Sequence, residues 1–439
     1  MLRKCSQLHL LLLGVEVTKM TLSEDSLAII LLCSNFLVSK KVLDTPKPLT
    51  IKEWDTISTK LRNSLLERPK AFFHSSPNEW RENLELNNEQ IERIQRLLAQ
   101  GGQLGVELDR LKSLGIWVTT RAETNYPSRF KKILREKSPT VLYGAGDITL
   151  CNDNLIAIVG SRDVDNDGVL FAESLGKKCA SESLGVVSGG SRGVDSIAQG
   201  AALSRGGRVV SVLSEGLESS TLKREIRSAI ASGKLLLLSA WHPKSGFKFY
   251  NALERNKHIY SLSNYSVVVS SAEKGGTWSG ATQNLKNNWV PLFVRSGECT
   301  PSGNNKLIEM GGIPLEGQLL TDKNVPLKDW FFEKATNSST QTTTLRKQAV
   351  NNSKYQIQLK FENNSNDDNQ NKFSDCNLDL FKVVWPYMQK LLETPKNVSE
   401  LAELLNIRDV QIQDWLKTAL DNGKVEELSE QGKYINCQM

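Results

Sequence analysis

The chain has 439 residues, which is too long for one typical core and indicates two to four domains. Its 39% hydrophobic and 24% charged residues are ordinary for a soluble protein, and its net charge of +6 is compatible with a nucleic-acid partner without requiring one. Its seven cysteines show no CxxC pair and no metal-ligand spacing, which argues against structural zinc and for free thiols in a reducing cytoplasm.

Residues 1–19 form an N-terminal extension whose apolar run, Leu8–Val15, is far shorter than a membrane span. The run follows Arg3 and Lys4, so a signal peptide has to be weighed, but no convincing small-residue cleavage site follows it. We favour Met20 as the true start, with residues 1–19 as translated upstream sequence. We therefore expect a cytoplasmic protein without a membrane partner.

Residues 20–149 are interpreted as a helical domain followed by a connector. Helices are predicted over the apolar-rich segment Ser23–Leu37, the amphipathic segment Ile51–Leu66, and Glu89–Leu114, where apolar residues recur at three- and four-residue spacing. The run Gly115–Thr120 then predicts a short strand.

Residues 150–334 alternate strands and helices at regular intervals. Near-continuous apolar runs predict strands over Leu155–Val159, Gly185–Ser188, Arg208–Leu213, Lys234–Leu238, Ser266–Ser270 and Val290–Arg295. Such runs are typical of a parallel sheet that is buried on both faces and connected by crossover helices. The predicted fold class is α/β, with a Rossmann-like doubly wound sheet that binds ligands at the carboxyl ends of its strands.

Residues 335–376 have too few large apolar residues to offset their chain entropy, and we predict a disordered linker. Residues 377–439 show the pattern of a winged helix, with helices over Leu380–Leu392, Val398–Leu405 and Val410–Asn422 and strands over Val425–Leu428 and Lys433–Ile435. This domain has 7 Lys and Arg against 10 Asp and Glu. Because phosphates would be repelled, we expect its third helix to contact protein rather than DNA.

Glycine-rich turns with arginine follow two consecutive predicted strands, and a third turn contains glycine and threonine. Glycine lets backbone N–H groups approach a ligand, a helix N-terminus favours an anion, and the arginine fork suits phosphate oxygens. A single glycine turn is as often explained by a tight strand-to-helix connection as by a ligand. Several such turns at one edge of the sheet favour phosphate binding. The predicted site comprises Gly160, Ser161, Arg162, Ser188, Gly189, Gly190, Ser191, Arg192, Arg255, Asn256, Lys257, Gly276 and Thr277.

These segments resemble the DNA-processing protein A family (DprA, also called Smf). The similarity is carried by Ala157–Arg162, Val187–Asp195, Gly207–Leu213 and Arg255–Lys257, and it extends over about residues 110–310. The resemblance implies a non-enzymatic protein with a SAM-like N-terminal domain that binds single-stranded DNA. It further implies protection of incoming or damaged DNA, loading of a RecA-type recombinase in natural transformation or repair, and a homodimer.

The resemblance also assigns roles to the site. The loop Gly160–Arg162 matches one phosphate contact, Ser188–Arg192 matches a second, and Arg255–Lys257 matches a further basic patch on the same edge. Asp195 is expected to order its loop rather than to touch DNA. Phe249 and Tyr250 could stack on bases, but aromatic residues at the start of a helix more often belong to a core.

Two loops, Ser214–Thr221 and Gly275–Gly280, depart from the family pattern. The second also resembles the lysine-decarboxylase-like phosphoribohydrolases, whose Rossmann fold hydrolyses or senses nucleotides, and this is the alternative function. No carboxylate lies between Thr277 and Arg295, which argues against hydrolysis and leaves nucleotide sensing open. No P-loop, Ser-His-Asp or Cys-His set is evident, so we predict no catalytic residue, no metal and no cofactor, and we expect His242 and His258 to be structural or DNA-facing.

Overall fold

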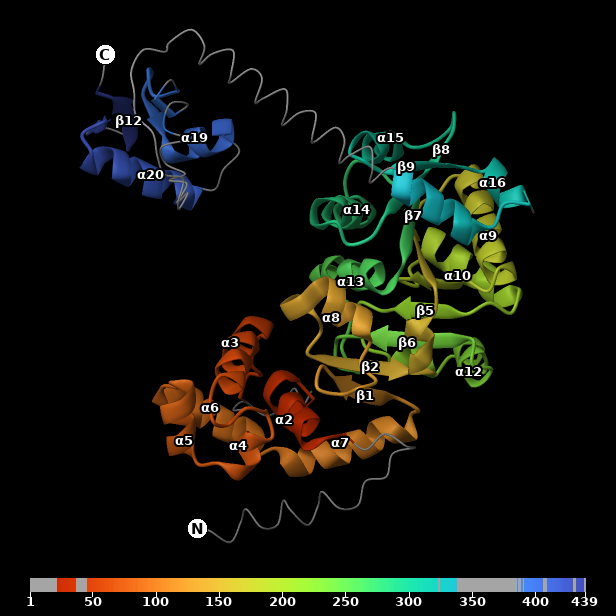
Figure 1. The fold of residues 1–439 in the computed structure, drawn as a ribbon, viewed down its shortest axis with the longest axis horizontal. Helices are drawn as coiled ribbons and strands as arrows, with labels where there is room; N and C mark the ends of the chain where they lie inside the picture. Colours follow the sequence, from red (N-terminus) through yellow and green to blue (C-terminus); the bar gives the residue numbers. More distant parts are fainter. Residues whose placement is uncertain are drawn as a thin grey trace, which may run out of the picture. The chain divides into compact units, whose positions relative to one another are not determined.

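The computed structural model describes residues 22–36, 46–322, 324–337, 385, 388–389, 391–405, 409–428 and 432–437. It divides into two compact units, Met1–Val350 and Asn351–Met439 (Figure 1). The predicted extension at residues 1–19 and the predicted linker from residue 338 onward lie outside the described residues. Residues 335–337, at the start of that linker, instead end a helix that spans residues 327–337.

The first part of the larger unit is helical, as predicted. Its helices are α2 (Glu24–Cys33), α3 (Ile51–Arg62), α4 (Ala71–His74), α5 (Pro77–Leu84), α6 (Asn88–Leu98) and α7 (Gly101–Ser113). Capping boxes at Thr50, Ser76 and Asn87 begin α3, α5 and α6 and satisfy backbone N–H groups that the helix leaves free. The apolar stripe of α6 buries Ile91 and Ile94, which fixes the side of the helix that faces the core.

A nine-stranded sheet follows, in the order β1-β2-β6-β5-β4-β3-β7-β8-β9. The strands are β1 (Trp117–Thr120), β2 (Val141–Ala145), β3 (Leu155–Gly160), β4 (Gly185–Ser188), β5 (Val209–Val212), β6 (Leu235–Ser239), β7 (Tyr265–Ser270), β8 (Leu292–Ser296) and β9 (Ile313–Glu316). The six strands predicted between residues 150 and 334 are confirmed to within two residues at each end. The pairs β1–β2 and β2–β6 are antiparallel, and the other pairs are parallel.

Helices cover both faces of the sheet, as the apolar strands predict. In β3, Ile156 and Ile158 enter one hydrophobic cluster, while Leu155, Ala157 and Val159 enter the cluster on the opposite face. The connecting elements are α8 (Ser128–Leu134), η1 (Arg135–Lys137), η2 (Ile148–Asn152), α9 (Asn166–Ser181), α10 (Val194–Ser204), α11 (Glu218–Thr221), α12 (Arg224–Ala231), α13 (Phe249–Leu262), α14 (Gly276–Asn287), α15 (Ser302–Glu309) and α16 (Gln318–Thr321).

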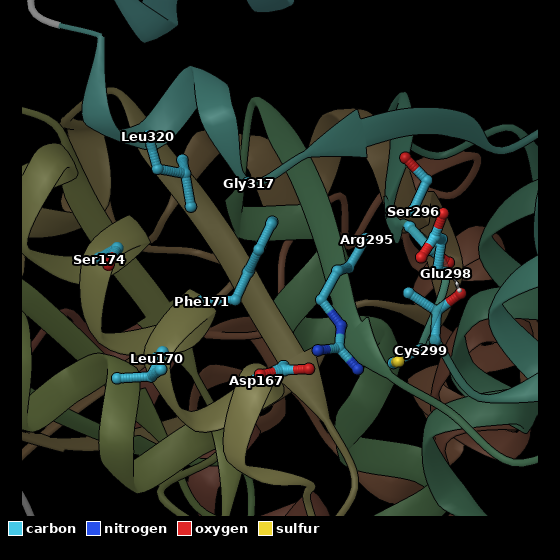
Figure 2. Close-up of a pocket in the computed structure, with 12 residues that line it drawn as sticks. Asp167, Leu170, Phe171, Ser174, Arg295, Ser296, Glu298, Cys299, Gly317 and Leu320 are labelled. Atoms are coloured by element: carbon cyan, nitrogen blue, oxygen red, sulfur yellow. Dashed lines mark hydrogen bonds between the residues drawn. The ribbon is translucent and has the colours of Figure 1, made fainter.

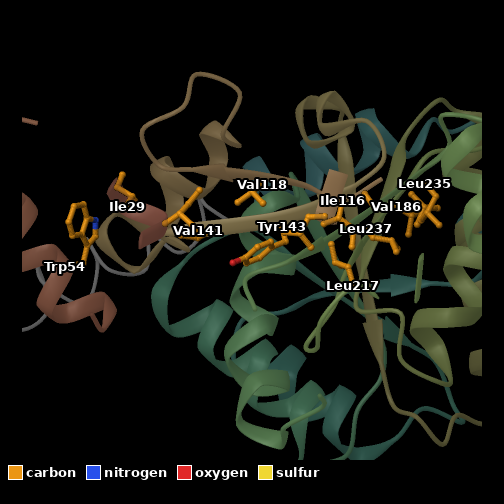
Figure 3. Close-up of a cluster of buried hydrophobic side chains, with 14 of the residues drawn as sticks. Ile29, Trp54, Ile116, Val118, Val141, Tyr143, Val186, Leu217, Leu235 and Leu237 are labelled. Atoms are coloured by element: carbon orange, nitrogen blue, oxygen red, sulfur yellow. The ribbon is translucent and has the colours of Figure 1, made fainter. Parts of the chain in front are cut away.

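The helical region and the sheet share one hydrophobic core. The cluster that includes Ile29 and Trp54 of the helical region continues through Val118 and Tyr143 to Leu237 of the sheet (Figure 3). The predicted domain boundary at residue 150 falls between β2 and β3 of the same sheet, and the division into separate domains stays a prediction. No helix in the described ranges is long and apolar enough to cross a membrane.

The smaller unit contains a three-stranded antiparallel sheet in the order β10-β12-β11. Its described elements are β10 (Lys396–Asn397), α19 (Val398–Leu405), α20 (Asp409–Asp421), β11 (Val425–Leu428) and β12 (Lys433–Asn436). Met388, Leu392, Leu401, Ile412 and Leu416 form its core. Most of the helix predicted over residues 380–392 lies outside the described residues.

Candidate functional site

The glycine loops after β3 and β4 interlock at the carboxyl edge of the sheet. A Cβ on Gly160 would lie 2.5 Å from Cγ2 of Val194, and a Cβ on Gly193 would lie 2.4 Å from the carbonyl oxygen of Ser161. Gly193 also has φ +87°, which favours glycine, and the Val194 N–H donates to the Ser161 carbonyl oxygen at 3.3 Å. The backbones of the two loops therefore pack directly against each other.

Each of these loops presents an exposed arginine. The Arg192 side chain is 78% exposed, and its Nη2 lies 2.8 Å from Oδ1 of Asp163, itself 90% exposed. An ion pair this open to water contributes little, so the guanidinium is free to exchange its partner for a ligand anion. Arg162 is exposed and lies 5.9 Å from the centre of the Phe247 ring. The structure thus brings together two predicted cations on adjoining loops.

Beneath the loop after β4 lies the buried carboxylate of Asp195. Burial raises the pKa of Asp195, and the positive charge of Arg255 acts in the opposite direction. The backbone N–H groups of Ser191 and Gly189 and the Ser188 hydroxyl each act to lower the pKa of this carboxylate. Because these two amides already act on a carboxylate of the chain itself, we expect anion recognition by this loop to depend above all on Arg192.

Arg255 does not lie in an exposed basic patch as the sequence suggested. It is 4% exposed, its Nη1 donates to the Val212 carbonyl oxygen at 2.9 Å, and a Cβ on Gly189 would lie 1.4 Å from that nitrogen. Burial lowers the pKa of Arg255, and the facing Asp195 opposes this shift. The guanidinium supports the glycine loop from below. The helical spacing of the buried residues Arg255, His258, Ile259 and Leu262 is the sequence signal for this burial.

The other predicted residues of α13 and α14 are also engaged within the protein. Asn256 Nδ2 donates to the Gly276 carbonyl oxygen at 3.0 Å, which ties α13 to the first turn of α14. Lys257 is paired with Glu254 on the same helix, and its side chain is 12% exposed. Gly276 and Thr277 are half-buried in the first turn of α14. These groups frame the site without adding an exposed cation to it.

Exposed aromatic side chains adjoin the two arginines. Phe247 is 49% exposed, Phe249 is 68% exposed and Tyr250 is 63% exposed, so the expectation that Phe249 and Tyr250 belong to a core is wrong. Lys248 Nζ lies 5.8 Å from the centre of the Tyr250 ring. Sequence reasoning missed Phe247 and Lys248 as part of this surface. Their alternation of cations and rings was the available signal.

A pocket of about 470 Å³ lies on the other side of the β3 loop, where α9 faces the end of β8 (Figure 2). At its base, Arg295 donates to both carboxylate oxygens of Asp165 at 3.0 and 2.8 Å. Asp165 in turn caps α9 by accepting from the Gly168 N–H at 2.5 Å. None of the sequence-predicted site residues lines this pocket. The Arg295–Asp165 pair anchors the end of the loop that carries Arg162.

Residues 117–318 match the family model of DNA recombination-mediator protein A. These residues are therefore similar to the DprA family. It is 28% identical over 201 residues to the DNA processing protein DprA of Bacillus subtilis (strain 168), covering 45% of this chain and 67% of that protein. It is 28% identical over 142 residues to DprA of Streptococcus pneumoniae, covering 32% of this chain and 50% of that protein.

Among solved structures, the chain is similar to DprA from Streptococcus pneumoniae, with a TM-score of 0.49 and 19% identity over 62% of this chain and 96% of that chain. The DprA match runs from β1 to the start of α16 and includes both glycine loops, Asp195 and Arg255. The smaller unit lies outside the matched residues.

Proposed function

We propose that this chain is a single-stranded DNA-binding recombination mediator of the DprA family. The observation that carries the proposal is the pair of exposed arginines, Arg162 and Arg192, on interlocked glycine loops at the carboxyl edge of the sheet. Guanidinium groups recognise phosphate oxygens in a sequence-independent and salt-dependent way. The similarity of residues 117–318 to a family named for DNA recombination points to a DNA backbone as the source of those phosphates.

The exposed aromatic residues favour a single strand over a duplex or a free nucleotide. Phe247, Phe249 and Tyr250 lie beside the cations Arg162 and Lys248. Single-strand binding proteins combine cations that hold the backbone with aromatic rings on which successive bases stack. Bases in a duplex are already stacked on one another, and a mononucleotide offers only one base. The site is therefore best suited to several consecutive unpaired nucleotides.

The remaining parts of the proposal follow the resemblance. The protein would act without catalysis in the cytoplasm, as a homodimer that protects incoming or damaged DNA and helps load a RecA-type recombinase in natural transformation or repair. The helical region would be a SAM-like domain. The smaller unit would be a winged helix that contacts protein, since α20 exposes Asp414 close to Lys417 rather than a set of cations.

The proposal is tested by equilibrium binding of a fluorescent single-stranded oligonucleotide longer than the ~16 nucleotides of a large single-strand binding module. Arg192→Ala and Arg162→Ala should each weaken binding at low salt by roughly tenfold and reduce its salt dependence by about one phosphate contact. Lys328→Ala, which removes an exposed cation from the helix at 327–337, is the matched control and should have little effect.

Stacking is tested separately. Phe249→Ala should cost about 1–3 kcal/mol of binding free energy if one base stacks on the ring. An excess of mononucleotide should not displace the oligonucleotide. Tight binding of a mononucleotide, together with no oligonucleotide binding, would overturn the proposal in favour of the nucleotide sensor.

A further inference from the structure

Exposed cations lie on the outer face of α12 and just beyond its two ends. This helix packs on β6 (Figure 1). Lys223 is the N-cap of α12, Arg224 is its first residue, Arg227 follows one turn later, and Lys234 comes just after the helix ends. We refer to these four residues as the α12 cations. The only acidic residue between positions 222 and 235 is Glu225. None of the α12 cations has an ion pair within the described part of the chain.

Some cations on other helices are neutralised by a carboxylate, which within the described ranges the α12 cations are not. Lys60 pairs with Glu85 at 2.6 Å, and Lys177 pairs with Glu173 at 2.9 Å. Ion pairs of this kind are the usual arrangement on a solvated helix face. The α12 cations therefore form a surface with an excess of positive charge.

The local energetics of α12 do not account for these charges. Lys223 makes no side-chain capping hydrogen bond, whereas Thr50 and Ser76 cap their helices. Arg227 stands four residues after Lys223 and three after Arg224, so three like charges share one face and repel one another. Cations in the first turn also oppose the helix dipole. An external polyanion would offset this repulsion.

The inner face of α12 explains why the cations point outward. Ile226, Ala229 and Ile230 pack against the core that lies under the sheet. Because these residues fill the inward positions of a helix of 3.6 residues per turn, Arg224 and Arg227 stay on the exposed side.

A single segment, residues 242–250, connects the candidate phosphate site to α12; it consists of a loop and the first two residues of α13. At one end, its Phe247 ring lies 5.9 Å from Arg162. At the other end, the Gly216 N–H donates to the Ser245 carbonyl oxygen at 2.8 Å, and the Glu218 N–H donates to the Pro243 carbonyl oxygen at 3.1 Å. Glu218 begins α11, which leads directly into Lys223.

The same loop exposes two further cations, Lys244 and Lys248. Exposed positive charges therefore continue from Arg162 through this loop to α12. A set of cations spread over three elements suits an extended polyanion better than an isolated phosphate.

We propose that the single strand held by the glycine loops continues along residues 242–250 and passes its phosphodiester backbone over the α12 cations. This inference rests on the proposed function and extends the DNA-binding surface from the glycine loops to α12. It makes affinity depend on oligonucleotide length. A strand of a few nucleotides reaches only the glycine loops, whereas a longer one also reaches α12.

The test compares the full chain with the double variant Lys223→Ala and Arg227→Ala. The matched control is Lys328→Ala with Lys334→Ala, which removes the same charge from exposed positions of the helix at 327–337. Alanine is a strong helix former, so all these proteins are expected to fold, and their unfolding midpoints in urea check this. Each protein is titrated with an oligonucleotide of ~4 nucleotides and with one longer than ~16 nucleotides, at several salt concentrations.

For the long oligonucleotide, the α12 variant should bind roughly tenfold more weakly, and the slope of log affinity against log salt should shrink by about 1.4, which is ~0.7 for each of two lost contacts. Affinity for the short oligonucleotide should be unchanged. An unaltered long-oligonucleotide affinity, as expected if α12 serves an acidic protein, would overturn the inference. An equal loss in the control would do the same. Absence of all oligonucleotide binding by the parent protein would instead contradict the proposed function.

Discussion

Arg192 belongs to the glycine loop after β4 and Arg255 packs against the same loop, but the surroundings of the two arginines differ sharply. Arg192 stands in solvent with one equally exposed partner, Asp163. Arg255 is buried, donates to the Val212 carbonyl oxygen and faces the buried Asp195 carboxylate. The carboxyl edge of the sheet therefore has two layers of cations, a buried layer that contains Arg255 and an exposed layer that contains Arg192. The buried layer builds the loop, and only the exposed layer is free to hold a ligand.

The difference between the buried and the exposed arginine is tested most directly by replacing each of them with alanine. Arg255→Ala leaves the buried Asp195 carboxylate facing no cation, and we expect the free energy of unfolding to fall by about 3–5 kcal/mol. Arg192→Ala should change it by less than about 0.5 kcal/mol, because its ion pair is exposed. Urea unfolding measures both values. Similar losses in the two variants would show that the layers are not distinct.

The contact between loop and buried layer can be tested with glycine substitutions. Gly189→Ala would place a methyl group 1.4 Å from Nη1 of Arg255, so the guanidinium must move, and we expect a loss of about 1–3 kcal/mol. Gly200→Ala is the control, because Gly200 lies in α10 with open space around its Cβ position. It should stabilise the protein by about 0.5–1 kcal/mol. A Gly189→Ala protein as stable as the parent would contradict the close packing.

Acid should weaken the buried layer through His258, one turn after Arg255 on α13. Burial lowers the pKa of His258 to about 3, whereas an unfolded histidine has a pKa of about 6.5. The unfolded state therefore binds the proton more readily, and the contribution of His258 to stability is lost as the pH falls from about 6.5 towards 3. The loss amounts to about 1.4 kcal/mol per pH unit within that window.

His258→Phe removes this titration while keeping a ring against Phe130 and Trp241, which His258 contacts at 5.5 and 6.2 Å between ring centres. Between pH 7 and pH 5 the parent should lose about 2 kcal/mol more stability than the variant. Parallel stability curves for the two proteins would count against the buried neutral histidine.

The sheet was largely predictable from sequence because its strands are short runs of buried apolar residues. The run Leu155–Val159 is fully apolar, and the observed β3 ends one residue later. Strand β9 was missed because only Leu315 of its four residues is buried and Pro314 interrupts it. The antiparallel pairing of β1 with β2 was missed as well. It depends on where β2 meets β6 in space, which no local pattern encodes.

The sequence was sufficient to predict which loops form the candidate site, but not which of its side chains are buried and which are exposed. Ser161, Arg162 and Ser188–Arg192 follow strand ends, and parallel topology alone brings them to one edge. Arg255 stands among Glu254, Asn256 and Lys257, a local composition that predicts exposure. Its burial is decided by the helix face shared with Ile259 and Leu262. For Phe249 and Tyr250, exposure follows from their place at the start of α13, away from that face.

Gly193 packs directly on the carbonyl oxygens of Ser161 and Arg162, and this packing affects how single-stranded DNA would bind. Since backbone contacts join the two loops directly, the spacing between the backbones that carry Arg162 and Arg192 is fixed before a ligand arrives. The two arginines are therefore held at a fixed backbone spacing, and the flexible phosphodiester backbone adjusts its conformation to it. Little conformational entropy of the protein is then lost on association, and nearly all the ordering falls on the nucleic acid.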